Sequence, residues 1–129
     1  MKILAEISVG ELYDKITILN IKLKKINDPN KLKNIKIELD ALIEQSNKLI
    51  LKDDEILRKN IQKLQDINEE LWDIENAKRE CEANKEFGEI FIKISRDVHF
   101  KNDIRASIKK EINLLSNSKI REEKEYSKY

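Results

Sequence analysis

Aliphatic residues recur at every third or fourth position through most of this 129-residue chain. Side chains with that spacing lie on one face of an α-helix, whereas a half-buried strand would need strict alternation. Only two Gly and one Pro interrupt the pattern, which is far below their average usage. The pattern therefore restricts the chain to long helices that bury their apolar faces against one another, with little or no β-structure.

Capping residues divide the first half of the chain into helices. Ser8 followed by Glu11 matches a capping box and predicts a first helix that extends to about Ile26. Asp28 caps and Pro29 occupies the first turn of the predicted second helix, which carries an apolar stripe. The stripe of that helix consists of Leu32, Ile35, Leu39, Leu42 and Leu49.

The second half of the chain predicts a longer pair of helices. Asp53 or Asp54 caps a third helix of about 30 residues, whose stripe runs from Leu57 to Cys81. The segment "ANKEFGE" forms the turn, and a fourth periodic run extends from residue 90 to residue 115. This run is either one helix or two helices broken near "FKND". We expect an all-α antiparallel bundle of three to five helices with a long coiled-coil-like hairpin.

We assign residues 1–117 to a single helical domain and residues 118–129 to a polar C-terminal tail, which Ile120 and Tyr126 could dock.

The formal net charge is +1, so the charge balance gives no indication of nucleic-acid binding. No apolar run is long enough to span a membrane. Glu6 and Glu11 interrupt the apolar patch at the start of the sequence, so we do not expect a secretory signal peptide there. The single Cys81 excludes an internal disulfide and fits a reducing cytoplasm.

The first predicted helix has a second, partly apolar face. Ile18 and Ile21 lie off its main stripe, close to Asp14. A helix with apolar residues on two sides is packed between two neighbours. We expect a homodimer with this helix near the two-fold axis and with Ile18 and Ile21 on the dimer face. The alternative is a monomer in which the first helix is central.

The fourth periodic run places cations inside an apolar face. Lys101 and Arg105 share one side of the helix with aliphatic residues such as Val98 and Ile108. A buried cation needs a partner, and acids for this role are available. These candidate acids are Glu11, Asp14, Glu75, Asp97 and Asp103. Three arrangements of the two cations are possible. They form buried ion pairs with these acids, or a kink at 99–103 rotates them outward into solvent. In the third arrangement they line a pocket for an anion such as phosphate or carboxylate.

Motifs for metal or cofactor binding are not found in the sequence. His99 is the only histidine, and no H-E-x-x-H or E-x-x-H pair or cysteine cluster is present, so we expect no metal site and no cofactor. Gly10 and Gly88 do not form a phosphate-binding loop. Trp72 lies beside the stripe residue Leu71 and is interpreted as a packing residue. The sequence leaves open whether the protein is an enzyme.

Several segments resemble a family of short bacterial helical proteins, a domain of unknown function. They are "ISVGELYDKITILNIKLKKINDPNKLKNIKIELDAL", "NEELWDIENAKRECEANKEFGEIFIKISRDVHFKNDIRASIKKEIN" and "EEKEY". The resemblance covers nearly the whole chain. It implies no activity, but it associates the protein with surface-polysaccharide functions. Its recurring polar positions correspond here to Glu11, Asp14, Lys15, Thr17, Glu75, Asn102, Asp103, Arg105, Lys109 and Asn113.

These polar residues are our candidate site, together with Lys101. The first functional hypothesis is a non-enzymatic helical interaction or scaffold module, a homodimer that binds another protein. The second is a small-molecule binding protein or enzyme that acts on a phosphate or sugar-nucleotide compound in surface-polysaccharide synthesis. An open cleft with spare donors at Asp14, Lys15 and Arg105 would favour the second hypothesis, and mutual pairing of these residues would favour the first.

Overall fold

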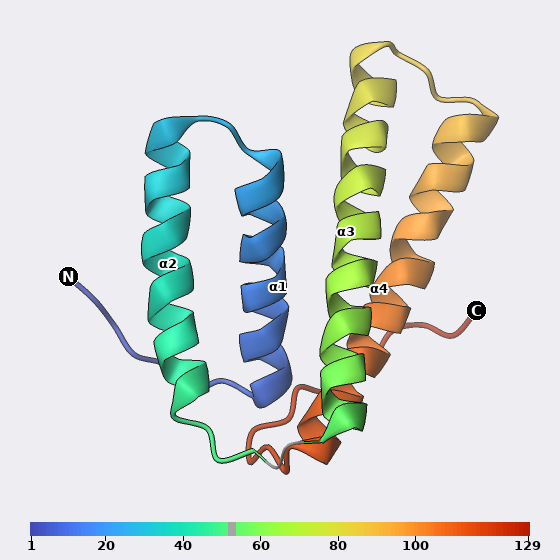
Figure 1. The fold of residues 1–129 in the computed structure, drawn as a ribbon. Helices are drawn as coiled ribbons and strands as arrows, with labels where there is room; N and C mark the ends of the chain where they lie inside the picture. The colour runs from blue at the N-terminus through green and yellow to red at the C-terminus, as the bar shows by residue number, and fades with distance from the viewer. Residues whose placement is uncertain (52–53) are drawn as a thin grey trace.

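The computed structural model describes residues 1–51 and 54–129, and this part of the chain forms four α-helices and no strand. The helices are α1 (Val9–Lys25), α2 (Pro29–Asn47), α3 (Glu55–Ala83) and α4 (Glu89–Leu115). Consecutive helices run antiparallel and form two hairpins, α1–α2 and the longer α3–α4 (Figure 1). The predicted all-α bundle with one long hairpin is confirmed.

The helices begin at the residues that capping chemistry selects. The Ser8 side chain accepts the backbone N–H of Glu11 at 3.1 Å, as an N-cap does. Asp28 and Asp54 cap α2 and α3 in the same way. The other candidate cap of α3, Asp53, lies outside the described residues. Three predicted helix starts therefore follow from local hydrogen bonding.

Helix α4 runs without a break through the "FKND" segment. The question of one helix or two is settled in favour of one, so residues 99–103 do not interrupt the face that carries Lys101 and Arg105. The cations at these positions must therefore be accommodated by neighbouring helices.

Helix α1 is the central element of the fold. It packs against α2, α3 and α4, whereas α2 contacts only α1 among the described helices. Leu19 packs with Ile35 and Leu39 of α2 on one side of α1. Ile21, on the other side, is 1% exposed within the single chain.

The burial of Ile21 corrects our assignment of this residue to a dimer face. A side chain that is already covered by its own chain has no surface left for a second copy. Ile18 is partly exposed and remains available. The second apolar face of α1 is thus explained by the central position of the helix, which was the alternative to a two-fold axis at α1.

A second apolar cluster joins the two long helices. Leu57, Leu64 and Ile67 of α3 surround Ile112 of α4, and Leu64 and Ile112 are fully buried. This cluster is separate from the one between α1 and α2. The contacts of α1 with α3 and α4 also include polar residues, which are described below.

The C-terminal tail folds back on the helices through polar contacts. The Ser118 hydroxyl accepts the backbone N–H of Val9 at 3.1 Å, and the Tyr129 hydroxyl donates to Asp103. Ile120 and Tyr126, the residues considered for docking, are both exposed. The tail is therefore held by hydrogen bonds at the start of α1 and along α4.

Candidate functional site

A buried carboxylate lies at the centre of the polar contacts between α1, α3 and α4. Asp14 of α1 is 1% exposed. Arg105 of α4 donates from Nε to Oδ1 of Asp14 at 2.9 Å and from Nη2 to Oδ2. This two-pronged geometry is the strongest form of the carboxylate–arginine pair. It connects α1 to α4 across 91 positions of sequence.

Helix α3 contributes an amide to the same carboxylate. The Asn68 side-chain nitrogen donates to Asp14 Oδ1 and to the Thr17 hydroxyl, each at 2.9 Å. The Thr17 hydroxyl in turn donates to the Asp14 backbone carbonyl at 2.8 Å. All three side chains are buried, and their hydrogen bonds offset the free energy of removing them from water.

A second cation extends the network toward the tail. Lys109 of α4 lies 2.6 Å from Glu11, 3.0 Å from Glu122 and 3.7 Å from Asp14. The Lys109 side chain is almost fully buried, so an unpaired ammonium there would be costly. The three carboxylates come from α1 and from the tail, and the pair with Glu122 holds the tail against α4. Glu11 is turned toward Lys109, where a capping box would have directed it to the backbone of Ser8.

The start of α1 approaches α4 closely because residue 10 is a glycine. A Cβ atom at Gly10 would lie 2.6 Å from the Lys109 carbonyl oxygen and 2.9 Å from Oδ1 of Asn113. The Gly10 N–H donates to Oδ1 of Asn113 at 2.7 Å. We refer to these connected groups as the polar seam, which consists of Gly10, Glu11, Asp14, Thr17, Asn68, Arg105, Lys109, Asn113 and Glu122.

The electrostatics of the polar seam favour the charged forms of Asp14, Arg105 and Lys109. Burial by itself would raise the pKa of Asp14, but hydrogen bonds from Arg105 and Asn68 outweigh it and lower this pKa below its usual value. Burial alone would lower the pKa of Lys109, but its bonds to Glu11 and Glu122 raise it. The Asp14 hydrogen bond raises the pKa of Arg105. The seam is therefore a set of matched ions.

The polar seam gathers six of the eleven candidate site residues. These are Glu11, Asp14, Thr17, Arg105, Lys109 and Asn113. Asn102 lies at its edge, where its side-chain oxygen accepts from Arg105 Nη1 at 3.5 Å. Asp14, the acid that pairs with Arg105, is one of the five candidate partners that the sequence offered for the cations.

The other four candidates lie outside the polar seam. Lys15 is exposed and pairs with Glu11 at 3.7 Å. Lys101 pairs with Glu70 of α3 at 2.7 Å, an acid that our candidate partners did not include. Asp103 accepts from Tyr129 on the surface, and Glu75 is 4.0 Å from Arg79. Each of these residues has its polar contact near the surface, where water competes with it.

Three members of the polar seam were missed by sequence reasoning. Asn68 lies four residues after Leu64 and three before Leu71, so its place in the apolar stripe was a usable signal. Gly10 gave no signal beyond its presence in a helix. Glu122 lies in the polar tail, and no periodicity connects it to Lys109. The contacts of Gly10 and Glu122 within the polar seam depend on how α1 and the tail pack against α4.

An open cleft borders the polar seam between α1, α3 and α4. Its volume is about 600 Å³. Arg105 and Asn68 line it, so two side chains belong to both the polar seam and the cleft. The remaining lining residues are Ile18, Ile21, Leu71, Trp72, Glu75, Asn76, Arg79 and Asn102. Trp72, interpreted from sequence as a packing residue, thus also borders open space.

The described residues, 1–51 and 54–129, place no three His, Cys, Asp or Glu side chains together as ligands for a metal ion. Within the same ranges, no helix has the length and hydropathy required to cross a membrane.

A family model described as "Family of unknown function (DUF6165)" matches residues 1–129 of the chain. No curated protein matches the sequence. No solved structure matches it either.

Proposed function

The chain belongs to this family of unknown function, and we propose that it is a non-enzymatic helical interaction module that works as a homodimer and binds a further protein in that form. The pairing within the polar seam supports a structural role for its charges. Asp14 and Lys109 are buried and matched by opposite charges, so neither is available to a substrate. The buried free thiol of Cys81 agrees with a reducing compartment such as the cytoplasm.

The extent of the surface carries the proposal. The described chain exposes 9824 Å². A compact monomer of 15.3 kDa is expected to expose roughly 7,100 Å². Sixteen large apolar side chains are exposed among the described residues, against ten buried apolar ones. The excess of about 2,700 Å² on one chain is larger than the roughly 800 Å² that each partner buries in a standard protein interface, so the chain has surface to lose on association.

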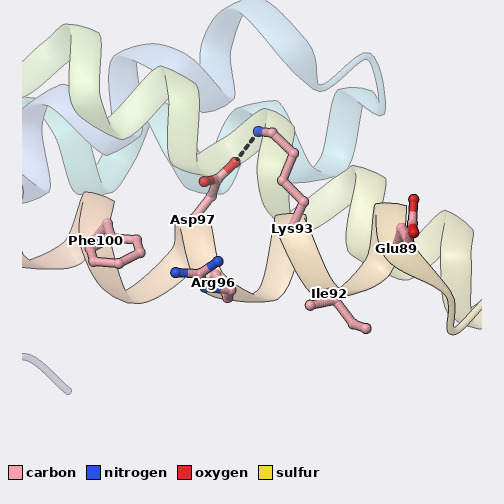
Figure 2. A pocket seen from close by; sticks show the side chains of 6 residues that line it. All are labelled: Glu89, Ile92, Lys93, Arg96, Asp97 and Phe100. Atoms are coloured by element: carbon pink, nitrogen blue, oxygen red, sulfur yellow. Dashed lines mark hydrogen bonds and ion pairs between the residues drawn. The ribbon is translucent and has the colours of Figure 1, made fainter. Parts of the chain in front are cut away.

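We place the interface on the outer face of α4, which is defined by Glu89, Ile92, Lys93, Arg96, Asp97 and Phe100. These residues line a shallow depression of about 410 Å³. Figure 2 shows that all of them come from this one helix and that Ile92 points away from the other helices. Because one helix lines the whole depression, a second chain that packs on this helix would cover it. Ile92 and Phe100 provide its apolar surface.

The charges on the outer face of α4 suit a second copy of the same chain. The face carries Glu89 and Asp97 together with Lys93 and Arg96, so its formal charge is balanced. In a dimer whose two-fold axis is perpendicular to α4, the two α4 helices run in opposite directions, and each acid can then face a cation of the partner. The Lys93–Asp97 pair within one helix, at 2.9 Å, is exposed and can exchange partners at little cost (Figure 2).

The molar mass in solution tests the proposal. Sedimentation equilibrium should give the mass of a dimer, near twice 15.3 kDa. Ile92→Glu should shift the protein to a monomer because it places a charge in an apolar contact. Ile37→Glu is the matched control, since Ile37 of α2 is 57% exposed and Ile92 is 55% exposed.

The two variants distinguish a specific interface from non-specific hydrophobic association. A loss of the dimer in Ile92→Glu but not in Ile37→Glu supports the outer face of α4. A monomeric wild-type protein at concentrations of about 100 μM would contradict the homodimer, and a dimer that survives Ile92→Glu would place the interface elsewhere.

A further inference from the structure

The cleft beside the polar seam has properties that self-association does not use. Arg96, in the outer face of α4, lies nine residues before Arg105, so at about 100° per residue the two point to opposite sides of the helix. The cleft therefore opens on a different surface from the proposed dimer contact. Its volume of about 600 Å³ lies within the range of about 300–1,000 Å³ typical of small-molecule sites.

Arg105 brings unused hydrogen-bond donors to the cleft. A guanidinium has about five N–H groups. Nε and Nη2 each donate one hydrogen to Asp14, and Nη1 donates one to Asn102 over a long 3.5 Å. Two N–H groups of Arg105 therefore remain, and the side chain is 28% exposed where it lines the cleft. The bond to Asp14 fixes the guanidinium plane, so these donors are already oriented before a ligand arrives.

A second arginine lines the same cleft with a nearly free charge. The Arg79 side chain is 82% exposed, and its charged partner among the described residues is Glu75 at 4.0 Å, the outer limit of an ion pair. An exposed pair at this distance contributes little stability, so Arg79 can turn to a ligand without a large loss. The two arginines and Glu75 give the cleft lining a formal charge of +1.

Asn68 also lines the cleft, but its amide already donates to Asp14 and Thr17, so the other polar lining groups come from Trp72, Asn76 and Asn102. Trp72 is half-buried at the cleft wall and offers an aromatic surface and an indole N–H. The two asparagine amides can both donate and accept hydrogen bonds, as recognition of hydroxyl groups requires. The cleft thus combines cations, amides and one aromatic side chain.

We propose that this cleft binds a small phosphorylated compound that contains a ring, with the phosphate on Arg105 and Arg79 and the ring against Trp72. A phosphate monoester presents three acceptor oxygens, so donors from two helices can bind it together. A planar guanidinium that is held in place is well suited to such an oxyanion. The proposal does not depend on the dimer, because the cleft is formed within one chain.

Intrinsic fluorescence provides a direct test, since Trp72 is the only tryptophan in the chain. Titration with ribose 5-phosphate at constant ionic strength should give a saturable change in emission. Ribose, which lacks the phosphate, should give none. Uridine monophosphate absorbs near the excitation wavelength, so its binding is measured by titration calorimetry.

Variants of the two arginines connect binding to the cleft. Arg79→Ala should weaken binding by about tenfold or more, the effect of losing one charge-assisted hydrogen bond. Lys59→Ala is the matched control, because Lys59 also pairs with a glutamate one turn earlier on α3, at 3.3 Å. It should leave the affinity unchanged. Arg105→Lys keeps the charge but removes the planar donor geometry, and it should also weaken binding.

Three results would overturn the proposal. The first is the absence of saturable binding of both ribose 5-phosphate and uridine monophosphate to the wild-type protein. The second is an equal response to ribose and to ribose 5-phosphate. The third is an equal affinity in Arg79→Ala and Lys59→Ala. Arg79 is almost fully solvated, so its replacement tests the site even if Arg105→Lys does not fold.

Discussion

The two faces of α4 use the same spacing for opposite purposes. Arg105, Lys109 and Asn113 follow one another at intervals of four residues on the inner face, where all three are tied to α1. Ile92, Arg96 and Phe100 have the same interval on the outer face, where Ile92 is exposed and Phe100 is half-buried against Tyr129 of the tail. One helix thus buries polar groups on one side and exposes apolar groups on the other.

This inversion shows that burial in this fold depends on available partners as well as on hydrophobicity. On the inner face Lys109 is buried and Arg105 half-buried because α1 and the tail supply carboxylates for them. Ile92 on the outer face is exposed, and α2, which packs on α1, does not contact α4. The inner face specifies how the helices fit together, and the outer face is the surface that we propose for the contact with another chain.

Removing an acid from each face should give the largest contrast. Asp14→Ala leaves the half-buried Arg105 and the buried amide of Asn68 without their carboxylate, and we expect a loss of about 3 kcal/mol in the free energy of unfolding. Asp97→Ala on the outer side breaks the exposed pair with Lys93 and should cost much less, because water screens that pair. Urea denaturation followed by circular dichroism measures both values. Equal losses would mean that the polar seam is no more structural than a surface pair.

The two glycines of the chain provide a second contrast. Gly10→Ala should destabilise the protein by about 1–3 kcal/mol, because the added Cβ overlaps the Lys109 carbonyl and forces α1 away from α4. Gly88→Ala is the matched control, since a Cβ there has no neighbour within 4 Å. Thermal unfolding of the two variants measures the difference. An unchanged melting temperature in Gly10→Ala would contradict the close approach.

Acid should weaken the polar seam, with a smaller effect than either substitution. The pKa of Asp14 is lower in the folded protein, so its stabilisation is complete above the unfolded value of about 3.9 and is lost as the pH falls through the folded value. The pKa of Glu122 is also lowered, by its bond to Lys109, and adds to the loss in the same direction.

The free energy of unfolding, measured from about pH 6 to about pH 2 in roughly 1 M salt, isolates this effect because salt screens the exposed pairs. Under these conditions Asp14→Asn should flatten the pH dependence, and Asp97→Asn should leave it close to wild type. A wild-type stability that does not fall in acid would show that the Asp14 carboxylate contributes no net stabilisation.

Much of the polar seam could be predicted from sequence, but its boundaries could not. Arg105 was recognisable because a cation in an aliphatic face requires an acid, and Asp14 was among the few acids available. Lys101 shared the same face, yet it turns outward to Glu70. A helical wheel gives the angle of a residue and not its distance along the axis from a neighbouring helix, so it could not distinguish these two outcomes.

Local chemistry along the chain was sufficient for the four helices. The 3-4 spacing and the caps at Ser8, Asp28 and Asp54 act within a few residues, so they hold whatever the helices pack against. The central place of α1, which buries Ile21, and the contact of Glu122 with Lys109 arise from groups far apart in sequence. Such contacts depend on how complete helices fit together, which is why only the tertiary structure decided them.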